Sequence, residues 1–161
     1  GFDSFFGQWN HKTDYYTRVA TDEDKPHRNG YDFHENEEVT KEGEGKFSTE
    51  LFSQKAVEVI TKHDQNEPLF LYVAYQAPHA PFQVPPERYT NLYKGTPQYH
   101  SKHITKYGII SALDDGVGKI VDSLRTSGMY NNTVFVFSTD NGGAFLDSSN
   151  LPLRCCKENN Y

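Results

Sequence analysis

Asp140 and Asn141 follow a short apolar run at residues 133–137, whose sequence TVFVF is typical of a buried strand. Ligands of open α/β sheets gather beyond the carboxyl ends of the strands, and these two side chains would lie at such an end. Both side chains offer hard oxygen atoms, which suit Ca²⁺ or Mg²⁺ better than a soft metal. Gly142 and Gly143 would let the backbone turn sharply beside a ligand. An ordinary strand-to-loop turn has the same composition, so the spacing alone leaves both interpretations open.

His79 is a second residue that could do chemistry. It follows a continuous apolar run at residues 69–75, which predicts another strand buried on both faces. Pro78 and Pro81 stiffen the loop around it, so the imidazole would be held at the carboxyl end of that strand. A lone histidine in a loop is more often structural or solvent-facing, and the pattern by itself does not decide between these roles.

The elements that would position these residues alternate between helix and strand. We expect a helix over Ser48–His63, with Ser48 as its N-cap, and a long amphipathic helix over Ser101–Ser127, ended by Gly128. The residues expected to face the core are Phe52, Ala56, Val59 and Ile60 on the first helix and Ile110, Leu113, Val117, Ile120, Val121 and Leu124 on the second. Helices that alternate with buried strands indicate an α/β protein with a parallel sheet.

Residues 1–44 show little periodicity and predict a long loop with aromatic anchors. Three polar pairs have no spacing that supports chemistry. We interpret His100 and His103 as surface residues, and Asp114-Asp115 as part of the solvated flank of the second helix. The adjacent residues Cys155-Cys156 are poor candidates for a disulfide, because neighbouring cysteines rarely bridge without strain, and the sequence assigns them no role.

Length and composition suit one folded domain. The chain has 161 residues, of which 35% are hydrophobic and 14% aromatic, and its net charge of −6 argues against nucleic acid as a partner. No apolar run is long enough to span a bilayer. The sequence begins with Gly1 rather than Met, so we expect an internal part of a longer protein. Asn131 begins the sequon Asn-Asn-Thr and is a candidate for N-glycosylation.

Several short motifs, in this order, resemble the sulfatase family and particularly its arylsulfatase B-like branch. They are residues 1–7 (GFDSFFG), 14–16 (DYY), 31–33 (YDF), 138–143 (STDNGG) and 152–157 (PLRCCK). The resemblance implies an α/β alkaline-phosphatase-like fold, here partial and built mainly on a parallel sheet flanked by helices. It also implies that residues 1–161 form an internal part of the catalytic domain, without the N-terminal nucleophile region and the C-terminal domain.

The resemblance also implies a site. His79 and Lys157 match the histidine and the lysine that contact the sulfate group in sulfatases, and both are expected to be catalytic and substrate-binding residues. Asp140 and Asn141 match two ligands of the family's Ca²⁺ cofactor. The formylglycine nucleophile of sulfatases is made from a cysteine in a Cys-x-Pro-Ser-Arg motif, which this sequence does not contain. The chain by itself is therefore expected to show no sulfatase turnover.

The expected activity is hydrolysis of a sulfuric ester in a sulfated small molecule or glycosaminoglycan, in the lysosome or outside the cell. Two alternatives stay open at this stage. One is a phosphatase or phosphodiesterase of the same fold, although such enzymes usually have more histidine ligands near the position of Asp140. The other is a secreted, non-catalytic protein, derived from a sulfatase, that binds anions or carbohydrates.

Overall fold

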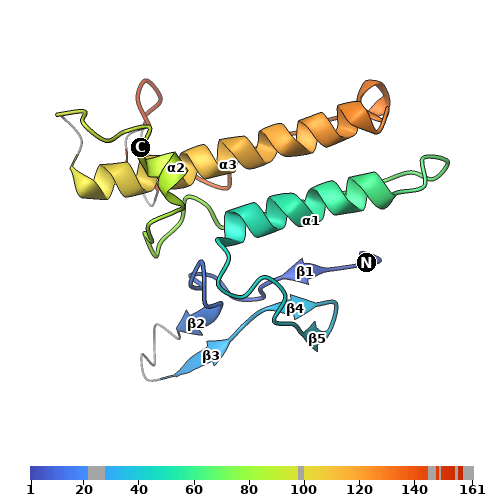
Figure 1. Cartoon of the computed structure of the whole chain (residues 1–161), viewed down its shortest axis with the longest axis horizontal. Helices are drawn as coiled ribbons and strands as arrows, with labels where there is room; N and C mark the ends of the chain where they lie inside the picture. The colour runs from blue at the N-terminus through green and yellow to red at the C-terminus, as the bar shows by residue number, and fades with distance from the viewer. Residues whose placement is uncertain (22–27, 98–99, 145–147, 149, 155, 158–161) are drawn as a thin grey trace. The chain divides into compact units, whose positions relative to one another are not determined.

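The structure is a computed structural model that describes residues 1–21, 28–97, 100–144, 148, 150–154, 156 and 157. It divides into two compact units, Gly1–Asn131 and Asn132–Tyr161, and each is described by itself. The first unit contains the helices and strands with labels in Figure 1. A short 3₁₀ helix, η1 (Tyr130–Asn132), lies where the two units meet in the sequence.

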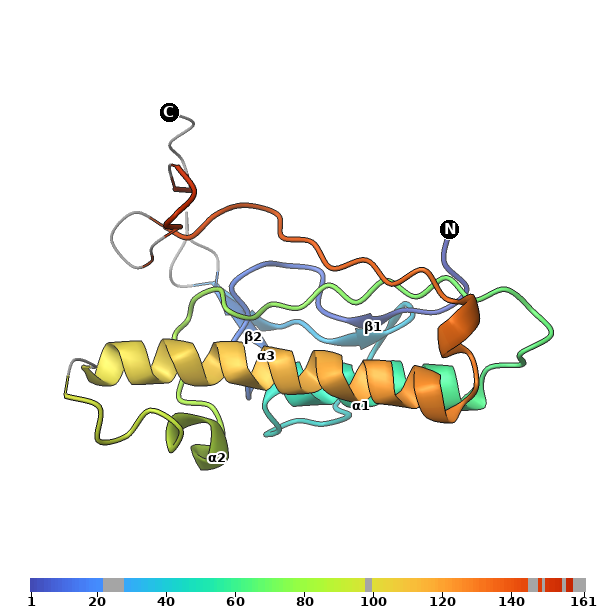
Figure 2. The ribbon, with the colours of Figure 1, turned by 90° about the horizontal axis from the view of Figure 1, so that it is seen from above.

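Two helices form the frame of the first unit. Helix α1 spans Ser48–Lys62 and helix α3 spans Ser101–Thr126, and both end within one residue of the predicted position. They lie side by side and run in the same direction (Figures 1 and 2). A third, short helix, α2 (Glu87–Thr90), packs on α3. None of the described helices combines the length and the apolar character that crossing a bilayer requires.

Helices α1 and α3 pack through a cluster of four buried side chains, with Ala56 and Ile60 on one helix and Ile120 and Leu124 on the other. Gly116 lies close by, buried against Ser53 of α1. This close packing gives a physical reason for a glycine inside the helix, where glycine costs about 1 kcal/mol relative to alanine.

The face that α3 buries is rotated from the predicted one. Ile109, Ala112 and Gly116 are buried, whereas Ile110 is 40% exposed. On α1, Val59 is likewise 39% exposed, although it was expected to face the core. Gly116 has no side chain and lies directly against Ser53 of α1, so the contact follows this glycine rather than the largest apolar side chains.

We predict that Gly116→Ala will destabilise the protein. A Cβ atom at this position would overlap the hydroxyl of Ser53 and lie 3.1 Å from the hydroxyl oxygen of Tyr75. We expect the free energy of unfolding, measured by urea denaturation, to fall by about 1–3 kcal/mol, because overpacking outweighs the better helix propensity of alanine. Gly118→Ala is the matched control, since nothing lies within 4 Å of its added methyl group, and it should stabilise the protein by about 0.5–1 kcal/mol. Equal effects at the two positions would contradict this account of the helix interface.

Helix α3 ends in a Schellman motif. Gly128 has a φ of +74°, and its N–H donates a 3.1 Å hydrogen bond to the carbonyl of Arg125. The N–H of Met129 donates a 2.9 Å hydrogen bond to the carbonyl of Leu124. This pair of hydrogen bonds needs a left-handed residue at Gly128, so the predicted helix stop is confirmed. The predicted N-cap of α1 is wrong, because the N-cap is Phe47 and the Ser48 hydroxyl lies instead 3.5 Å from the Gln76 side chain.

The region before α1 contains short antiparallel strands rather than the long loop that was predicted. Strands β1 (Phe6–Gly7), β4 (His34–Glu35) and β5 (Glu38–Val39) pair in the order β1-β4-β5. Strands β2 (Val19–Thr21) and β3 (Asn29–Tyr31) form a separate ladder. The prediction of aromatic anchors in this region is confirmed, because the side chains of Tyr15 and Phe33 are fully buried.

The segments predicted as buried strands, residues 69–75 and 133–137, are not paired in any β-ladder of the described chain. In the first segment, Leu69, Leu71, Val73 and Tyr75 pack against the α1–α3 cluster. The residues between them point away, and Phe70 is 78% exposed. Val134 in the second segment is 90% exposed. An apolar run predicts burial on both faces, but here the helices cover only one face of residues 69–75.

Candidate functional site

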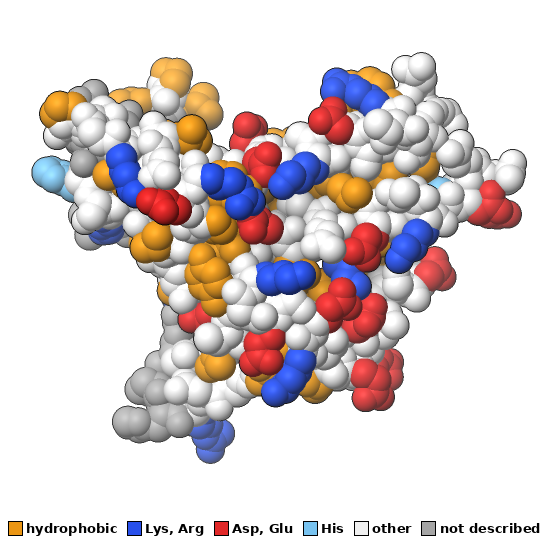
Figure 3. All heavy atoms as spheres, viewed as in Figure 1, with side chains coloured by type: hydrophobic (Ala, Val, Ile, Leu, Met, Phe, Trp, Pro, Cys, Tyr) orange, Lys and Arg blue, Asp and Glu red, His pale blue; other side chains and the backbone are white. Residues whose placement is uncertain are grey.

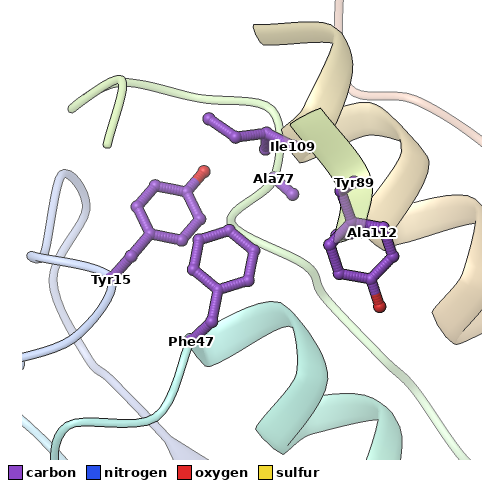
Figure 4. Close-up of a cluster of buried hydrophobic side chains, with 6 residues drawn as sticks. All are labelled: Tyr15, Phe47, Ala77, Tyr89, Ile109 and Ala112. Carbon is purple, nitrogen blue, oxygen red and sulfur yellow. The ribbon is translucent and has the colours of Figure 1, made fainter. Parts of the chain in front are cut away.

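A buried aromatic cluster lies beneath the loop that carries His79. The rings of Tyr15 and Phe47 stack with their centroids 5.0 Å apart (Figure 4). Ala77, Ile109 and Ala112 complete the cluster beside them, with Tyr89 of α2. The loop therefore lies against a packed core at Ala77, two residues before the histidine.

His79 itself is half-buried and held through its backbone. Its N–H donates a 2.9 Å hydrogen bond to the carbonyl of Gln76, and its carbonyl accepts a 2.8 Å hydrogen bond from the Tyr15 hydroxyl. The imidazole Nδ1 lies 2.9 Å from the carbonyl oxygen of Ala80. The tautomer with a proton on Nδ1 satisfies this contact, and it leaves Nε2 available for a ligand.

Two glutamines tie both ends of this loop to residues 13–15. The Gln76 amide donates to the carbonyl oxygen of Thr13. Gln83 accepts a 2.6 Å hydrogen bond from the N–H of Tyr15 and donates a 2.6 Å hydrogen bond to the Asp14 carboxylate. The sequence predicted the loop but not the residues that anchor it, because hydrogen bonds between segments more than 60 residues apart leave no local pattern.

Burial and hydrogen bonding fix the protonation states of two of these anchors. Burial raises the pKa of Tyr15, so its hydroxyl remains a donor throughout the physiological range. Burial alone would raise the pKa of Asp14, but hydrogen bonds from the N–H groups of Thr17 and Tyr16 and from the Gln83 amide hold it below its ordinary value. The Asp14 carboxylate therefore stays ionised as an acceptor.

We predict that Tyr15→Phe will impair the function of His79 without unfolding the protein. The change removes the hydroxyl that binds the His79 carbonyl and leaves that carbonyl without this donor. We expect a stability loss of about 1 kcal/mol and a decrease in kcat/KM of the full-length protein of about threefold to tenfold.

Tyr16→Phe is the matched control for this change. Its hydroxyl donates a comparable 2.6 Å hydrogen bond, but to the carbonyl of Val84, which lies further from His79 in the sequence. A similar loss of stability with a smaller loss of turnover is expected. Equal losses of turnover in the two variants would show that the Tyr15 hydroxyl has no special link to His79.

Asp140 and Asn141 form an exposed turn in the second unit. Asp140 Oδ1 accepts a 2.8 Å hydrogen bond from the N–H of Asn141, and the Asn141 amide nitrogen donates a 2.8 Å hydrogen bond to the Gly142 carbonyl. The Asn141 carbonyl in turn accepts a 2.9 Å hydrogen bond from the hydroxyl of Thr139. These contacts engage one oxygen of the carboxylate and the amide nitrogen, so Asp140 Oδ2 and Asn141 Oδ1 are the oxygens that a cation would meet.

Gly142 and Gly143 leave room for the side chains of Asn150 and Ser148. A Cβ atom on Gly142 would lie 2.5 Å from the amide nitrogen of Asn150, and one on Gly143 would overlap Ser148. The Gly143 N–H also donates a 2.9 Å hydrogen bond to the side-chain oxygen of Asn150. The glycines were expected to let the backbone approach a ligand closely, and in this structure the space beside them holds Ser148 and Asn150.

Lys157 lies next to this turn. Its backbone N–H donates a 2.9 Å hydrogen bond to the carbonyl of Gly143, and Lys157 forms a parallel bridge with Ala144. The second unit thus brings Lys157 and the Asp140–Asn141 turn together, although they are far apart in the sequence. Cys155 lies outside the described residues, and Cys156 is a half-buried free cysteine.

The predicted meeting of His79 with Asp140 stays a prediction, because these residues belong to different units. The described residues contain no group of three or more His, Cys, Asp or Glu side chains that could hold a metal ion. Asp140 and Asn141 have the hard oxygens that Ca²⁺ prefers, but they provide two side chains where Ca²⁺ takes about six to eight oxygen ligands. The pair therefore fits part of a calcium site rather than a whole one.

Arg18 is fully buried, although no sequence pattern predicted this. Its guanidinium donates to the carbonyl oxygens of Tyr15, Gly43 and Lys46 and lies 5.0 Å from the centroid of the Phe33 ring. Burial lowers its pKa. These contacts hold the region before α1 together, so Arg18 has a structural role rather than a place in the site.

The chain matches known proteins along its length. The sequence model of the family described as Sulfatase matches residues 1–161. Arylsulfatase J of Mus musculus is 37% identical over 98% of this chain and 26% of its own length. N-acetylgalactosamine-6-sulfatase of Mus musculus is 31% identical over 100% of this chain and 31% of its own length.

The fold of the chain also matches a solved structure. The crystal structure of Ps i-CgsB in complex with k-i-k-neocarrahexaose aligns with a TM-score of 0.82 and 29% identity, over 98% of this chain and 36% of that one. The predicted alkaline-phosphatase-like fold class is thereby confirmed. The chain spans about a quarter to a third of the length of these relatives.

Proposed function

Because this chain belongs to the sulfatase family, we propose that the full-length protein is a Ca²⁺-dependent hydrolase of sulfuric esters in sulfated glycans. The observation that carries the proposal is the match of the family over all 161 residues. The backbone hydrogen bond between Lys157 and Gly143 adds local support, because it joins the segment of Lys157 to the segment that follows Asp140 and Asn141.

In this proposal His79 and Lys157 bind the sulfate group. With a proton on both ring nitrogens, His79 would keep its Nδ1 contact and donate a hydrogen bond from Nε2 to a sulfate oxygen. The ammonium of Lys157 would donate in the same way, where negative charge builds up as the ester bond breaks. A rigid loop suits His79 to this role, because a donor that is already oriented needs no rearrangement during the reaction. The sequence contains no Cys-x-Pro-Ser-Arg motif, so no residue of this chain is assigned as the nucleophile.

Asp140 and Asn141 would provide two of the Ca²⁺ ligands, through Asp140 Oδ2 and Asn141 Oδ1. When bound, the ion would act as a Lewis acid that offsets negative charge on the sulfuryl oxygens. The turn keeps both side chains exposed on one short segment, as a cation entering from solvent requires.

A sulfated glycan is the substrate class that the relatives support. One relative is named for N-acetylgalactosamine 6-sulfate chemistry, and a structural neighbour was crystallised with a hexaose. No contact in the described residues favours the alternative of a phosphatase or phosphodiesterase. The non-catalytic alternative predicts binding without turnover, and the following experiment separates it from an enzyme.

The test is release of inorganic sulfate by the full-length protein. We expect turnover of a chromogenic aryl sulfate and of a sulfated glycosaminoglycan oligosaccharide, and loss of both after treatment with a calcium chelator. Binding of the oligosaccharide without sulfate release would contradict the proposal and favour the non-catalytic alternative. Turnover that is unchanged by the chelator would contradict the role given to Ca²⁺.

We predict N-glycosylation of Asn131 and, with it, a lysosomal or secreted location. Asn131 is exposed in η1, and Thr133 completes the sequon. Protein from a secretory host should lose the mass of a glycan from the peptide containing Asn131 on treatment with an N-glycosidase. Thr133→Ala should abolish this change, and a peptide of unmodified mass from the untreated protein would contradict the prediction.

A further inference from the structure

We propose that the outer face of the first two turns of α3 binds a sulfated oligosaccharide together with neighbouring aromatic rings. We call this surface the ring-and-cation strip. It consists of Phe82, Tyr93, His100, His103, Lys106 and Tyr107. The inference rests on the proposed function, and it extends that function from one sulfate group to the sugar chain that carries it.

The strip contains a continuous row of rings. The ring centroids of His100 and His103 are 5.9 Å apart, those of His103 and Tyr107 are 6.1 Å apart, and those of Tyr107 and Tyr93 are 5.5 Å apart. Residues three and four apart lie on one face of a helix, so His103 and Tyr107 share a face. Aromatic rings present apolar faces with polar tips, which suits contact with the C–H faces of sugars.

A cation and two exposed imidazoles lie along the same row. The ammonium of Lys106 is 5.2 Å from the centroid of the Phe82 ring, and the side chains of His100 and His103 are exposed. Residues 100–113 contain no Asp or Glu, and the first carboxylate of the helix is that of Asp114. A sulfated chain would therefore meet no carboxylate of residues 100–113, and the nearby carboxylate of Glu87 is paired with Lys94 at 2.8 Å.

The strip continues from the His79 loop. Phe82, which contacts Lys106, follows His79 by three residues. Residues 100–107 cover about 10 Å along the helix axis, at a rise of 1.5 Å per residue. That length exceeds a single sulfate group, so the strip suits further units of a chain whose sulfated end is held at His79.

The groove between α1 and α3 is a less suitable surface for a sulfated chain, because it contains carboxylates. Acidic and basic side chains alternate there, including Glu50, Arg88, Lys119 and Asp122. Figure 3 shows Lys and Arg interspersed with Asp and Glu over this face, whereas histidine surface is visible beside the start of α3. Carboxylates in the groove would repel sulfate groups, so the ring-and-cation strip is the better surface for a polyanion.

The test measures binding apart from catalysis. The full-length protein with His79→Ala is titrated with a fluorescently labelled, sulfated glycosaminoglycan hexasaccharide and with the same hexasaccharide after desulfation. We expect tighter binding of the sulfated form, with an affinity that falls as salt is raised. Adding His103→Gln and Lys106→Gln should weaken binding of the sulfated form by about threefold to tenfold.

Lys119→Gln in the same background is the control, because Lys119 is an exposed cation on the same helix that pairs with Asp115 at 2.8 Å. It should leave the affinity unchanged. Equal affinities with and without the strip substitutions, in variants with the same Tm, would overturn the proposal, as would equal weakening by Lys119→Gln. Turnover of a small aryl sulfate by the protein with His79 intact tests the proposed function separately, so the failure of one proposal is distinguishable from the failure of the other.

Discussion

His79→Ala in the full-length protein is expected to lower kcat/KM for a sulfuric ester by about 10²- to 10³-fold. The Gln76 carbonyl binds the backbone N–H of His79, and the Ala80 carbonyl lies 2.9 Å from the imidazole Nδ1, so Nε2 is left for the sulfate. Removing the imidazole takes away a donor aimed at charge that develops in the reaction, so we expect a larger effect on kcat than on KM. Steady-state kinetics with an aryl sulfate would measure both constants.

His63→Ala is a suitable control for this prediction. His63 lies just after α1, and its Nε2 is 2.8 Å from the carbonyl oxygen of Glu67, so its ring is used in a local contact. We expect this variant to keep its activity. A His79→Ala protein that retains turnover within threefold of the unsubstituted protein would remove His79 from the site.

Helices were predictable because their signals are local. The period of apolar residues and the stop at Gly128 placed α3 within one residue of its observed end at Thr126. The face that α3 buries was not predictable in the same way, because Gly116 packs against Ser53, a residue of another helix. A row of large apolar residues indicates that a helix has a buried side. The closest approach between two helices, however, is set by the small residues on both helices.

The short strands before α1 had one sequence signal that the prediction did not use. β4 and β5 are joined at Asn36-Glu37, and Asn36 has a φ of +56°. Asparagine tolerates this conformation better than most residues, and it is common in two-residue hairpins. Strands of two or three residues are too short to show an alternating pattern, so the rest of this region could not be predicted.

The two apolar segments show that composition alone does not predict strand pairing. Residues 69–75 and 133–137 have the composition of buried strands, but pairing depends on neighbours that the composition does not identify. Within the described chain, one side of residues 69–75 packs on the helix layer, whereas Phe70 and Tyr72 on the other side are exposed. The pattern therefore predicted both the pairing and the burial on two faces incorrectly for these segments.

Motifs predicted the candidate site residues, whose roles stay predictions, but they did not predict the contacts that support those residues. His79, Asp140, Asn141 and Lys157 were recognised from motifs, and the contact of Lys157 with Gly143 agrees with two motifs that serve one site. The hydrogen bond from Tyr15 to His79 joins residues 64 apart and depends on how the chain folds. Such long-range contacts have no local signature, so only the structure reveals them.

Asp140→Ala is expected to abolish Ca²⁺-dependent turnover of the full-length protein. Asp140 offers the one negative charge of its turn, and Asn141 can contribute only a neutral oxygen. Loss of a charged ligand should lower the affinity for Ca²⁺ by about 10- to 100-fold or more, and activity at low Ca²⁺ should fall with it. Titration of chelator-treated protein with Ca²⁺, followed by sulfate release and by isothermal calorimetry, would measure the affinity with and without catalysis.

Asp114→Ala separates this effect from a general loss of negative charge. Asp114 is an exposed carboxylate on α3 that belongs to no candidate site, so its removal should leave the Ca²⁺ affinity unchanged. Asn141→Ala should weaken Ca²⁺ binding less than Asp140→Ala, because an amide oxygen contributes no net charge. If Asp140→Ala binds Ca²⁺ as tightly as the unsubstituted protein does, the turn is an ordinary one, and the metal ligands must be sought elsewhere in the protein.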